Sequence, residues 1–249
     1  MTYVLTTAFK PSASQENDAK ALATSLQIPY QKRYKLSLKR IGQGYDGVFV
    51  LYKDSLRFVH PDGQMLCFHP DTAMLRLKAE HDPLRYLIGE ARKSVLDLTM
   101  GLASDSILMA GAGHEVTALE SELVPYTVMS YGLAHYHSNY APLERAMRSI
   151  RTVHSSAKTF LEKQADASFD IIYYDPMFVR NIQESQNLSA LSPLANHEPL
   201  SKALFEQMKR VARDKVIMKA HFQDDVFERF GFERLRRPNQ KSHYGIYVI

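Results

Sequence analysis

Cysteine is almost missing from this chain of 249 residues, which contains only Cys67. One cysteine cannot form an intrachain disulfide, and clustered thiolate metal sites are excluded. Histidine supplies no metal site either, because His135 and His137, two residues apart, would not face each other on a helix. We therefore predict no metal site, and we interpret Cys67 as a small residue of a strand rather than as a nucleophile.

Long hydrophobic runs are missing as well. No segment approaches the roughly twenty apolar residues that cross a bilayer, and the amino terminus has no signal-peptide pattern. These absences favour a soluble, cytoplasmic protein that does not bind membranes. Because 45% of its residues are hydrophobic, the chain can bury a full core as one large domain or as one medium domain with an appendage. The composition leaves the oligomeric state open.

The glycine pattern of dinucleotide-binding sites is also absent. After the apolar segment 95–98, Gly101 is present, but Ala103 and Ser106 occupy the next two glycine places of G-x-G-x-x-G. That pattern lets the backbone approach a pyrophosphate at a helix amino terminus, where the charge of Asp105 would repel it. These observations argue against a nicotinamide-dependent oxidoreductase.

The amino-terminal part predicts a small α+β unit, which we place at residues 1–80, before a larger domain at residues 81–249. Residues 14–26 have the apolar spacing of a helix, and Asp62-Gly63 favours a tight hairpin turn. A further helix over 73–80 leads out of the unit. Strands are predicted at residues 3–7, 48–52, 56–59 and 65–68.

Strands alternate with helices in the larger domain. Such alternation implies parallel pairing with crossover helices, so we predict an α/β fold with a doubly wound, mostly parallel sheet. A short loop separates residues 232–236 from 243–248, which permits a hairpin and an antiparallel last strand. The other strands are predicted at residues 95–98, 116–120, 150–153, 169–174 and 215–219, and the helices at 104–111, 123–137 and 224–230.

Acidic side chains mark the ends of the first two strands of this domain. Asp97 ends the first strand, Asp105 follows in the first turn of the next helix, and Glu120 ends the second strand. S-adenosylmethionine carries an ammonium and a sulfonium charge but no phosphate. Asp97 and Asp105 would attract these charges, the amides of the turn from Gly101 to Asp105 could bind its carboxylate, and Glu120 could accept both ribose hydroxyls. A helix cap at Asp105 and a solvated strand end at Glu120 are the plainer alternatives.

A second motif, Asp175-Pro176-Met177-Phe178, follows the strand at 169–174. Methylation of an exocyclic base amine needs acceptors for its N–H groups, and the Asp175 carboxylate and the Pro176 carbonyl can supply them. Phe178 can stack on an extruded base, although a core aromatic is the alternative. The motif therefore indicates a site that positions an amine and needs no protein nucleophile.

Two weaker signals lie at neighbouring strand ends. His154-Ser155-Ser156 could offer hydroxyl or backbone donors to an adenine, although serines after a strand are commonly turn formers. Lys219 ends the strand at 215–219, where it could touch a substrate phosphate or lie on the surface.

Positive charge is gathered in two places, although the net charge is only +4 and the isoelectric point is near 9.0. Such clusters suit a polyanion such as RNA, and a solvated surface is the alternative. The clusters are Lys32, Arg33, Lys35, Lys39 and Arg40 near the amino terminus, and Arg229, Arg234, Arg236, Arg237 and Lys241 near the carboxyl terminus.

From about Ser94 to its end, the sequence resembles the RsmJ-like methyltransferases, which methylate the N2 amine of a guanine in small-subunit ribosomal RNA. Residues 97–105 look like the family's D-A-T-A-G-L-G-R-D, and residues 175–178 equal its D-P-M-F. The resemblance implies a Rossmann-like class I methyltransferase fold with S-adenosylmethionine as the cofactor. It implies cofactor contacts from Ser104, Asp105, Glu120, Ser121, Ser156 and Asp175, with Ser121 contributing its backbone.

The sequence departs from this family on the expected substrate side. Val179-Arg180-Asn181 replaces the family's P-H-K, and Arg180 could supply the lost positive charge toward the substrate. We predict methyl transfer to an exocyclic amine of RNA, with guanine N2 of small-subunit ribosomal RNA as the acceptor, either as naked RNA or within the subunit. Two alternatives stay open. The acceptor could be a DNA base, a protein amide or a small molecule, or the chain could be a non-catalytic RNA-binding or ribosome-assembly protein that retains the cofactor crevice.

Overall fold

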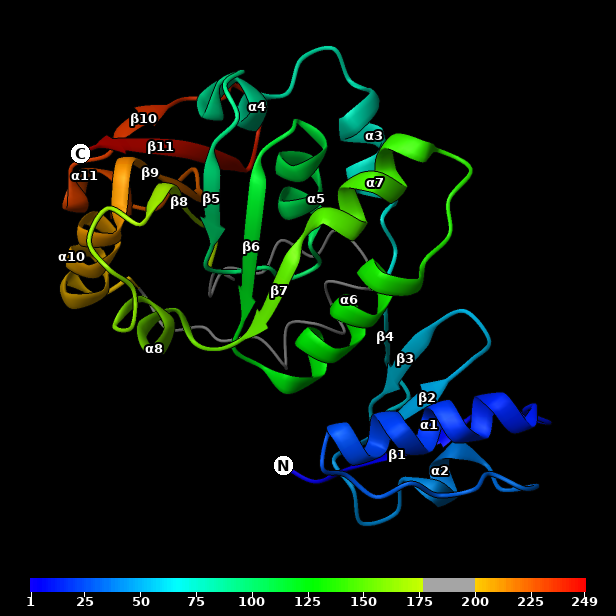
Figure 1. Ribbon diagram of the computed structural model, residues 1–249. Coiled ribbons are helices and arrows are strands. Elements are labelled where there is room, and N and C mark those ends of the chain that lie inside the picture. The colour runs from blue at the N-terminus through cyan, green and yellow to red at the C-terminus, as the bar shows by residue number, and fades with distance from the viewer. Residues whose placement is uncertain (177–199) are drawn as a thin grey trace.

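The computed structural model describes residues 1–176 and 200–249 and arranges their strands in two sheets (Figure 1). The smaller sheet has the order β1-β2-β3-β4, with β1 parallel to β2 and the other pairs antiparallel. Its four strands and the helix α1 confirm the elements predicted for the amino-terminal part. The elements are β1 (Tyr3–Thr7), α1 (Ala13–Ser25), α2 (Leu38–Ile41), β2 (Gly47–Leu51), β3 (Leu56–Val59) and β4 (Met65–Cys67).

The predicted hairpin turn joins β3 to β4. Gly63 has a φ of +91°, a conformation that glycine adopts without steric cost, and its N–H donates to the His60 carbonyl. The Asp62 carboxylate accepts a hydrogen bond from the Gln64 N–H at 2.9 Å. The Asp-Gly pair therefore forms the turn for the reason that the sequence suggested.

The larger sheet has seven strands in the order β10-β11-β9-β8-β5-β6-β7. The strands from β9 to β7 are parallel, and β11 pairs antiparallel with both β9 and β10, as predicted. This is the doubly wound sheet of a Rossmann-like class I methyltransferase fold. Its strands are β5 (Ser94–Asp97), β6 (Glu115–Glu120), β7 (Arg151–His154), β8 (Phe169–Tyr174), β9 (Ala212–His221), β10 (Glu233–Leu235) and β11 (Ser242–Val248).

Helices cover both faces of this sheet (Figure 1). Because side chains alternate along a strand, Tyr173 packs in the core beneath α5 and α6, whereas Tyr174 packs in the core shared with α10. Both tyrosines are therefore buried. The helices are α3 (Asp71–Lys78), α4 (Pro83–Ile88), α5 (Ser104–Gly111), α6 (Leu123–His135), α7 (Ala141–Ser149), α8 (Ala157–Leu161), α10 (Lys202–Val211) and α11 (Val226–Phe230).

Two glycines allow close packing around α5 and α6. A Cβ atom on Gly132 of α6 would lie 2.1 Å from the ring of Phe68, which follows β4, and a Cβ on Gly111 of α5 would lie 2.3 Å from Leu77 of α3. The hydrophobic core consequently runs without a break from the small sheet into the large one. The proposed division near residue 80 stays a prediction, and α3, which precedes it, packs against α5 and α7.

The strand order places β5 between β6 and β8, with crossovers leaving toward opposite faces on its two sides. Ligands of doubly wound sheets bind at the carboxyl ends of the strands at such a switch point. The ends of β5, β6, β8 and β9 therefore meet at one edge, and this edge holds the candidate site.

Candidate active site

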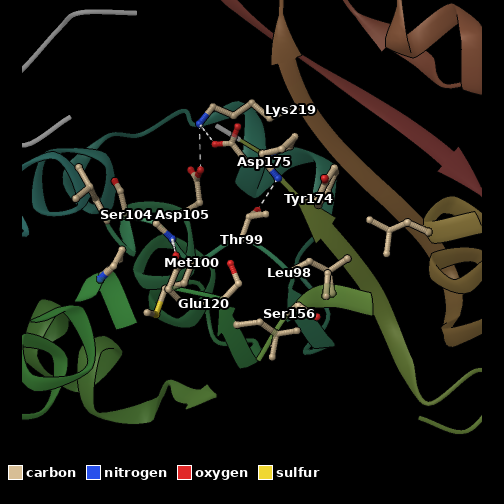
Figure 2. A pocket seen from close by; sticks show the side chains of 18 of the residues that line it. Leu98, Thr99, Met100, Ser104, Asp105, Glu120, Ser156, Tyr174, Asp175 and Lys219 are labelled. Atoms are coloured by element: carbon tan, nitrogen blue, oxygen red, sulfur yellow. Dashed lines mark hydrogen bonds and ion pairs between the residues drawn. The ribbon is translucent and has the colours of Figure 1, made fainter. Parts of the chain in front are cut away.

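The turn between β5 and α5 forms one wall of a cavity at this edge (Figure 2). Gly101 and Ala103 have φ values of +50° and +62°, so the chain turns sharply before α5 begins. Ala103 is the N-cap of α5, so the alternative of a helix cap at Asp105 is not realised, and no side-chain cap bond is formed there. The first amides of α5 thus remain available to a ligand carboxylate.

Asp97 does not line the cavity. It is only 1% exposed, and its carboxylate accepts hydrogen bonds from Thr99 N at 3.0 Å and from the Ser106 hydroxyl. Burial raises the pKa of Asp97 to about 7. The expectation that Asp97 attracts a cofactor charge directly is therefore wrong, because its carboxylate lies behind the turn and holds the backbone of the turn in place.

Glu120 lies at the end of β6 and faces the cavity (Figure 2). Its carboxylate accepts hydrogen bonds from Gly101 N at 3.3 Å and from Glu122 N at 3.0 Å, and burial raises its pKa. A carboxylate has about four acceptor positions, so these bonds leave acceptor capacity for a ligand hydroxyl. Glu120 thus occupies the strand-end position that the sequence predicts for a contact with the ribose.

Asp175 follows β8 on the opposite side of the turn. Its backbone N–H donates to the Thr99 hydroxyl at 2.7 Å, and its Oδ2 lies 2.6 Å from Lys219 Nζ (Figure 2). Lys219 Nζ also lies 3.1 Å from Asp105 Oδ2, so one ammonium bridges two carboxylates. Lys219 therefore holds two carboxylates at the cavity, and its contact with a substrate phosphate stays a prediction.

Arg76 of α3 extends this arrangement to the neighbouring helix. It forms ion pairs with Asp105 and with Asp82, the N-cap of α4, the latter at 2.8 Å. Arg76, Asp82, Asp105, Asp175 and Lys219, which we call the charged cluster, contain two cations and three carboxylates. The cluster consequently carries one unmatched negative charge beside the cavity, which favours a positively charged ligand.

The ionisation of the charged cluster follows from these contacts. Burial opposes the charge of Asp105, but Lys219 and Arg76 outweigh it and lower the pKa of that carboxyl. Burial raises the pKa of Asp175 to about 6, although Lys219 opposes this shift. Burial likewise opposes the charge of Lys219, yet Asp105 and Asp175 raise its pKa. Asp175 is thus ionised at neutral pH and takes up a proton in mildly acidic solution.

Asp105 does not present a free charge to the cavity. It also accepts a hydrogen bond from the Tyr173 hydroxyl at 2.8 Å, in addition to its two cationic partners. The sequence argument that its charge repels a pyrophosphate is therefore wrong as stated, because that charge is compensated. Its proposed contact with the cofactor stays a prediction.

The cavity has a volume of about 1210 Å³, somewhat above the roughly 300–1,000 Å³ of ordinary small-molecule pockets. It has space for a nucleoside-sized ligand together with an acceptor group. Its lining includes Thr72, Arg76, Leu98, Thr99, Gly101, Ser104, Asp105, Glu120, Ser121, Ser156, Tyr174, Asp175, Pro176, Leu204, Gln207 and Lys219.

The serines at this edge differ in what they can offer. Ser104 Oγ is buried in the cavity wall without a hydrogen-bond partner in the described part of the chain. Ser156 caps α8 by accepting from Thr159 N at 3.1 Å, and the Ser155 hydroxyl donates to the Ser156 carbonyl. Ser155 is not among the lining residues, whereas Ser121 is. Ser104 thus offers an unused polar group to a ligand.

The sequence did not indicate Arg76 or Thr99, although both hold the site together. The helix containing Arg76 was predicted, but no local pattern shows that this arginine reaches Asp105. Phe178 and Arg180 lie outside the described residues, so their proposed roles stay predictions. Across residues 1–176 and 200–249, no three His, Cys, Asp or Glu side chains gather as metal ligands, and no helix combines the length and apolar character that a membrane span requires.

Comparison with known proteins defines the class. A family model of SAM-dependent methyltransferases matches residues 85–248, more than half of the chain. The chain therefore belongs to this family, and S-adenosylmethionine is its cofactor. A solved structure of a SAM-dependent methyltransferase from Neisseria gonorrhoeae has the same fold, with a TM-score of 0.60, 15% identity, and coverage of 98% of this chain and 95% of the other.

Individual relatives show which methyltransferases this chain resembles. The uncharacterized protein YpiP of Bacillus subtilis is 29% identical over 252 residues, which cover 98% of both chains. The ribosomal RNA small subunit methyltransferases J of Desulfotalea psychrophila and Thioalkalivibrio sulfidiphilus are 26% and 27% identical over 131 and 151 residues. These matches cover 51% and 58% of this chain and span 49% and 59% of the two relatives. The resemblance to the RsmJ-like methyltransferases is thereby confirmed.

The residues at the cavity fit the cofactor. The free amides of α5 and the unpartnered Ser104 hydroxyl suit its carboxylate, Glu120 has acceptor positions for its ribose, and the charged cluster suits its positive sulfur. We propose that the α5 amides, Ser104 and Glu120 lie on the cofactor side of the cavity, and that Asp175 and Pro176 lie on the acceptor side.

Proposed function

We propose that this methyltransferase modifies an exocyclic amine of RNA, with guanine N2 of small-subunit ribosomal RNA as the acceptor. The observation that carries the proposal is the position of Asp175 and Pro176, which line the same cavity as Glu120 and Ser104. The names of the relatives support ribosomal RNA as the substrate class. The Asp-Pro-Met-Phe motif equals that of the RsmJ-like methyltransferases, which supports guanine N2 as the acceptor.

The chemistry of such an amine explains the residue types. Its lone pair is delocalised into the base, so the site must hold the N–H groups and direct the nitrogen into the cavity. The Asp175 carboxylate and the Pro176 carbonyl can accept these two N–H groups. Thr99 holds the backbone of Asp175, and Lys219 holds its carboxylate, so the acceptors are fixed before the base arrives.

When bound, S-adenosylmethionine supplies an electrophilic methyl group on a positively charged sulfur. Asp175 is ionised at neutral pH and can accept the proton that the amine nitrogen releases as its bond to the methyl group forms. Glu120 and Ser104 would hold the remainder of the cofactor, which leaves the Asp175 carboxylate to the acceptor. Positioning, charge complementarity and proton acceptance by Asp175 are thus the contributions of the protein.

The first test measures methyl transfer to small-subunit ribosomal RNA from cells that lack this protein. We expect Asp175→Ala to lower kcat by at least about a hundredfold, the usual scale for a positioned proton acceptor, and to change cofactor affinity only modestly. Asp225→Ala, which removes an 80% exposed carboxylate of the surface pair with Arg229, is the matched control and should keep full activity. Unchanged transfer by Asp175→Ala would contradict the mechanism.

The second test identifies the product. Mass spectrometry of ribosomal RNA nucleosides should show N2-methylguanosine in cells with the protein and its loss in cells without it. Methylation of a DNA base, a protein amide or a small molecule in place of RNA would favour the alternative acceptors. Cofactor binding without transfer to any acceptor would favour a non-catalytic RNA-binding protein.

A further inference from the structure

Two aromatic side chains are exposed at the end of the small unit where β1 stops and α1 starts. Phe9 is 57% exposed and Tyr34 is 73% exposed. Each ring has a cation on one face, with Arg33 Cζ 3.8 Å from the ring centre of Phe9 and Lys32 Nζ 5.3 Å from that of Tyr34. A cation on one face holds an aromatic ring and leaves its other face to a ligand.

Arg33 carries a buried charge that lacks a counterion. The residue is 8% exposed, and its Nη1 donates to the Thr7 carbonyl at 3.4 Å. Its Nε has no hydrogen-bond partner, and within residues 1–176 and 200–249 it forms no ion pair with a carboxylate. A buried cation without an anionic partner is unfavourable, so an anion bound at this end would offset a cost that is already present.

The surrounding surface is basic. Glu16 is already paired with Lys32 at 2.9 Å, so its charge does not compensate Arg33. Four further exposed cations that form no ion pair among the described residues lie within a few residues of Phe9 or Tyr34 in the sequence. They are Lys10, Lys35, Lys39 and Arg40.

The backbone at this end is held in an uncommon conformation. Lys10 and Tyr34 have φ values of +53° and +41°, in the left-handed region that residues with a side chain rarely adopt. Residues held in this way recur at binding sites, where the surrounding structure fixes them. The side chains of the two loops are therefore presented in a defined arrangement.

We propose that Phe9, Tyr34, Lys10, Arg33 and Lys35 form a platform for unpaired RNA, on which bases stack against the two rings while the cations neutralise phosphates. This inference rests on the proposed function, in which RNA is the acceptor. Stacking on exposed rings above a basic surface is how proteins bind single strands without reading their sequence. An acidic peptide would match the charge but leaves the two open rings unexplained.

The platform lies apart from the catalytic cavity. Figure 1 shows the first turn of α1 at the end of the small unit that points away from β5, β8 and β9. RNA bound there contacts the protein equally in the ground state and in the transition state, so the platform should lower KM and leave kcat unchanged.

The test uses the full chain, a fluorescent single-stranded oligouridylate and a duplex RNA of the same length in anisotropy titrations. We expect Phe9→Ala and Tyr34→Ala each to weaken binding of the single strand by about tenfold, within the usual range for one stacked base, and to leave duplex binding unchanged. Arg33→Met should weaken both RNAs and lower the slope of log affinity against log salt concentration by about one. Affinity for S-adenosylhomocysteine should stay unchanged in all three variants.

The control is Tyr86→Ala, because Tyr86 is an 82% exposed aromatic of α4 without a cation over its ring in the described structure. Phe9 is itself exposed, so its variant remains informative even if Arg33→Met fails to fold. Single-strand affinity of the Phe9 and Tyr34 variants equal to that of the unmodified chain would overturn the platform. Polyglutamate that displaces the oligouridylate as effectively as unlabelled oligouridylate would also overturn the platform, because such a result needs only negative charge and no stacking.

Methylation of ribosomal RNA, measured in parallel, separates this inference from the proposed function. If the unmodified chain methylates RNA and the three variants match it in both KM and kcat, the platform is wrong and the methyltransferase assignment stands. If the unmodified chain binds the oligouridylate through these residues but methylates no RNA, the proposed acceptor is wrong and the platform stands.

Discussion

Lys219 Nζ lies 2.6 Å from the Asp175 carboxylate, so the residue that we propose to position the acceptor amine is itself held by an ion pair. The same ammonium reaches Asp105, which Arg76 neutralises from the other side. The acceptor side of the cavity is thus connected through charges to α3, a helix that precedes the methyltransferase sheet in the chain.

The first prediction concerns pH. Because the pKa of Asp175 is raised to about 6, its carboxylate gains a proton as pH falls through 6, and it then loses its ability to accept the amine proton. We expect kcat to be constant above this value and to fall about tenfold per pH unit below it. A pH–rate profile with saturating substrates measures this limb.

Lys219→Met should shift the acid limb of this pH–rate profile. Without the ammonium, burial and the charge of Asp105 act on Asp175 unopposed, so its pKa rises by at least about one unit and the acid limb moves to higher pH. Lys215→Met is the matched control, because Lys215 lies on the same strand and donates to the Leu87 carbonyl outside the site. An unshifted limb in Lys219→Met would show that another group governs the profile.

The second prediction concerns Arg76. Its replacement by Met leaves Asp82 and Asp105, whose side chains are 7% and 12% exposed, without their shared cation. We expect the free energy of unfolding to fall by about 3 kcal/mol in urea denaturation, as for other broken buried pairs. Arg92→Met, which breaks an exposed pair with Glu115 at 3.7 Å, should cost less than about 1 kcal/mol. Similar losses in both variants would rule out a special role for Arg76.

The third prediction concerns Glu120. Glu120→Gln keeps the size of the side chain but turns one acceptor into a donor, so it loses bonds to the ribose and to the backbone N–H groups. Calorimetric titration with S-adenosylhomocysteine should show at least a tenfold weaker Kd, which equals about 1.4 kcal/mol. Glu115→Gln, at the other end of the same strand and 72% exposed, should bind normally. If both variants bind alike, Glu120 does not contact the cofactor.

The sequence was sufficient for the architecture of the two sheets, because apolar runs of strand length and the Asp62-Gly63 turn are local signals. The predicted elements do not include α7 and α10, although both helices have local signals in the sequence. Proline stands at the start of α7, and Ser201 caps α10 by accepting from Leu204 N at 3.1 Å. These helices could have been found from caps and spacing alone.

The site could be predicted only in part, and the reason is distance along the chain. The fold brings several of the site residues to one edge because they lie at or just after the ends of strands: Asp97, Gly101, Glu120 and Asp175. The partners of Asp105 are 29 and 114 residues away in Arg76 and Lys219. No pattern in one sequence reveals such pairs, so the acidic residues appeared as free charges when most of their charge is matched.

The fourth prediction concerns the joint between the two sheets. Gly132→Ala places a Cβ where the Phe68 ring lies, 2.1 Å away, and overpacking of this kind costs about 1–3 kcal/mol. We expect a lower Tm that the double variant Gly132→Ala/Phe68→Leu largely restores. A single variant as stable as the unmodified chain would show that the ring moves aside freely.

The contact between Gly132 and Phe68 also bears on how a long substrate is held. Because Phe68 packs closely against Gly132 at this joint, the small unit is held directly against α6 of the domain that contains the candidate site. If the proposed function and the proposed platform both hold, an RNA that engages the platform and the cavity at once presents its bound strand and its target base at the separation that this contact sets, and we expect substrates to be selected by their three-dimensional dimensions.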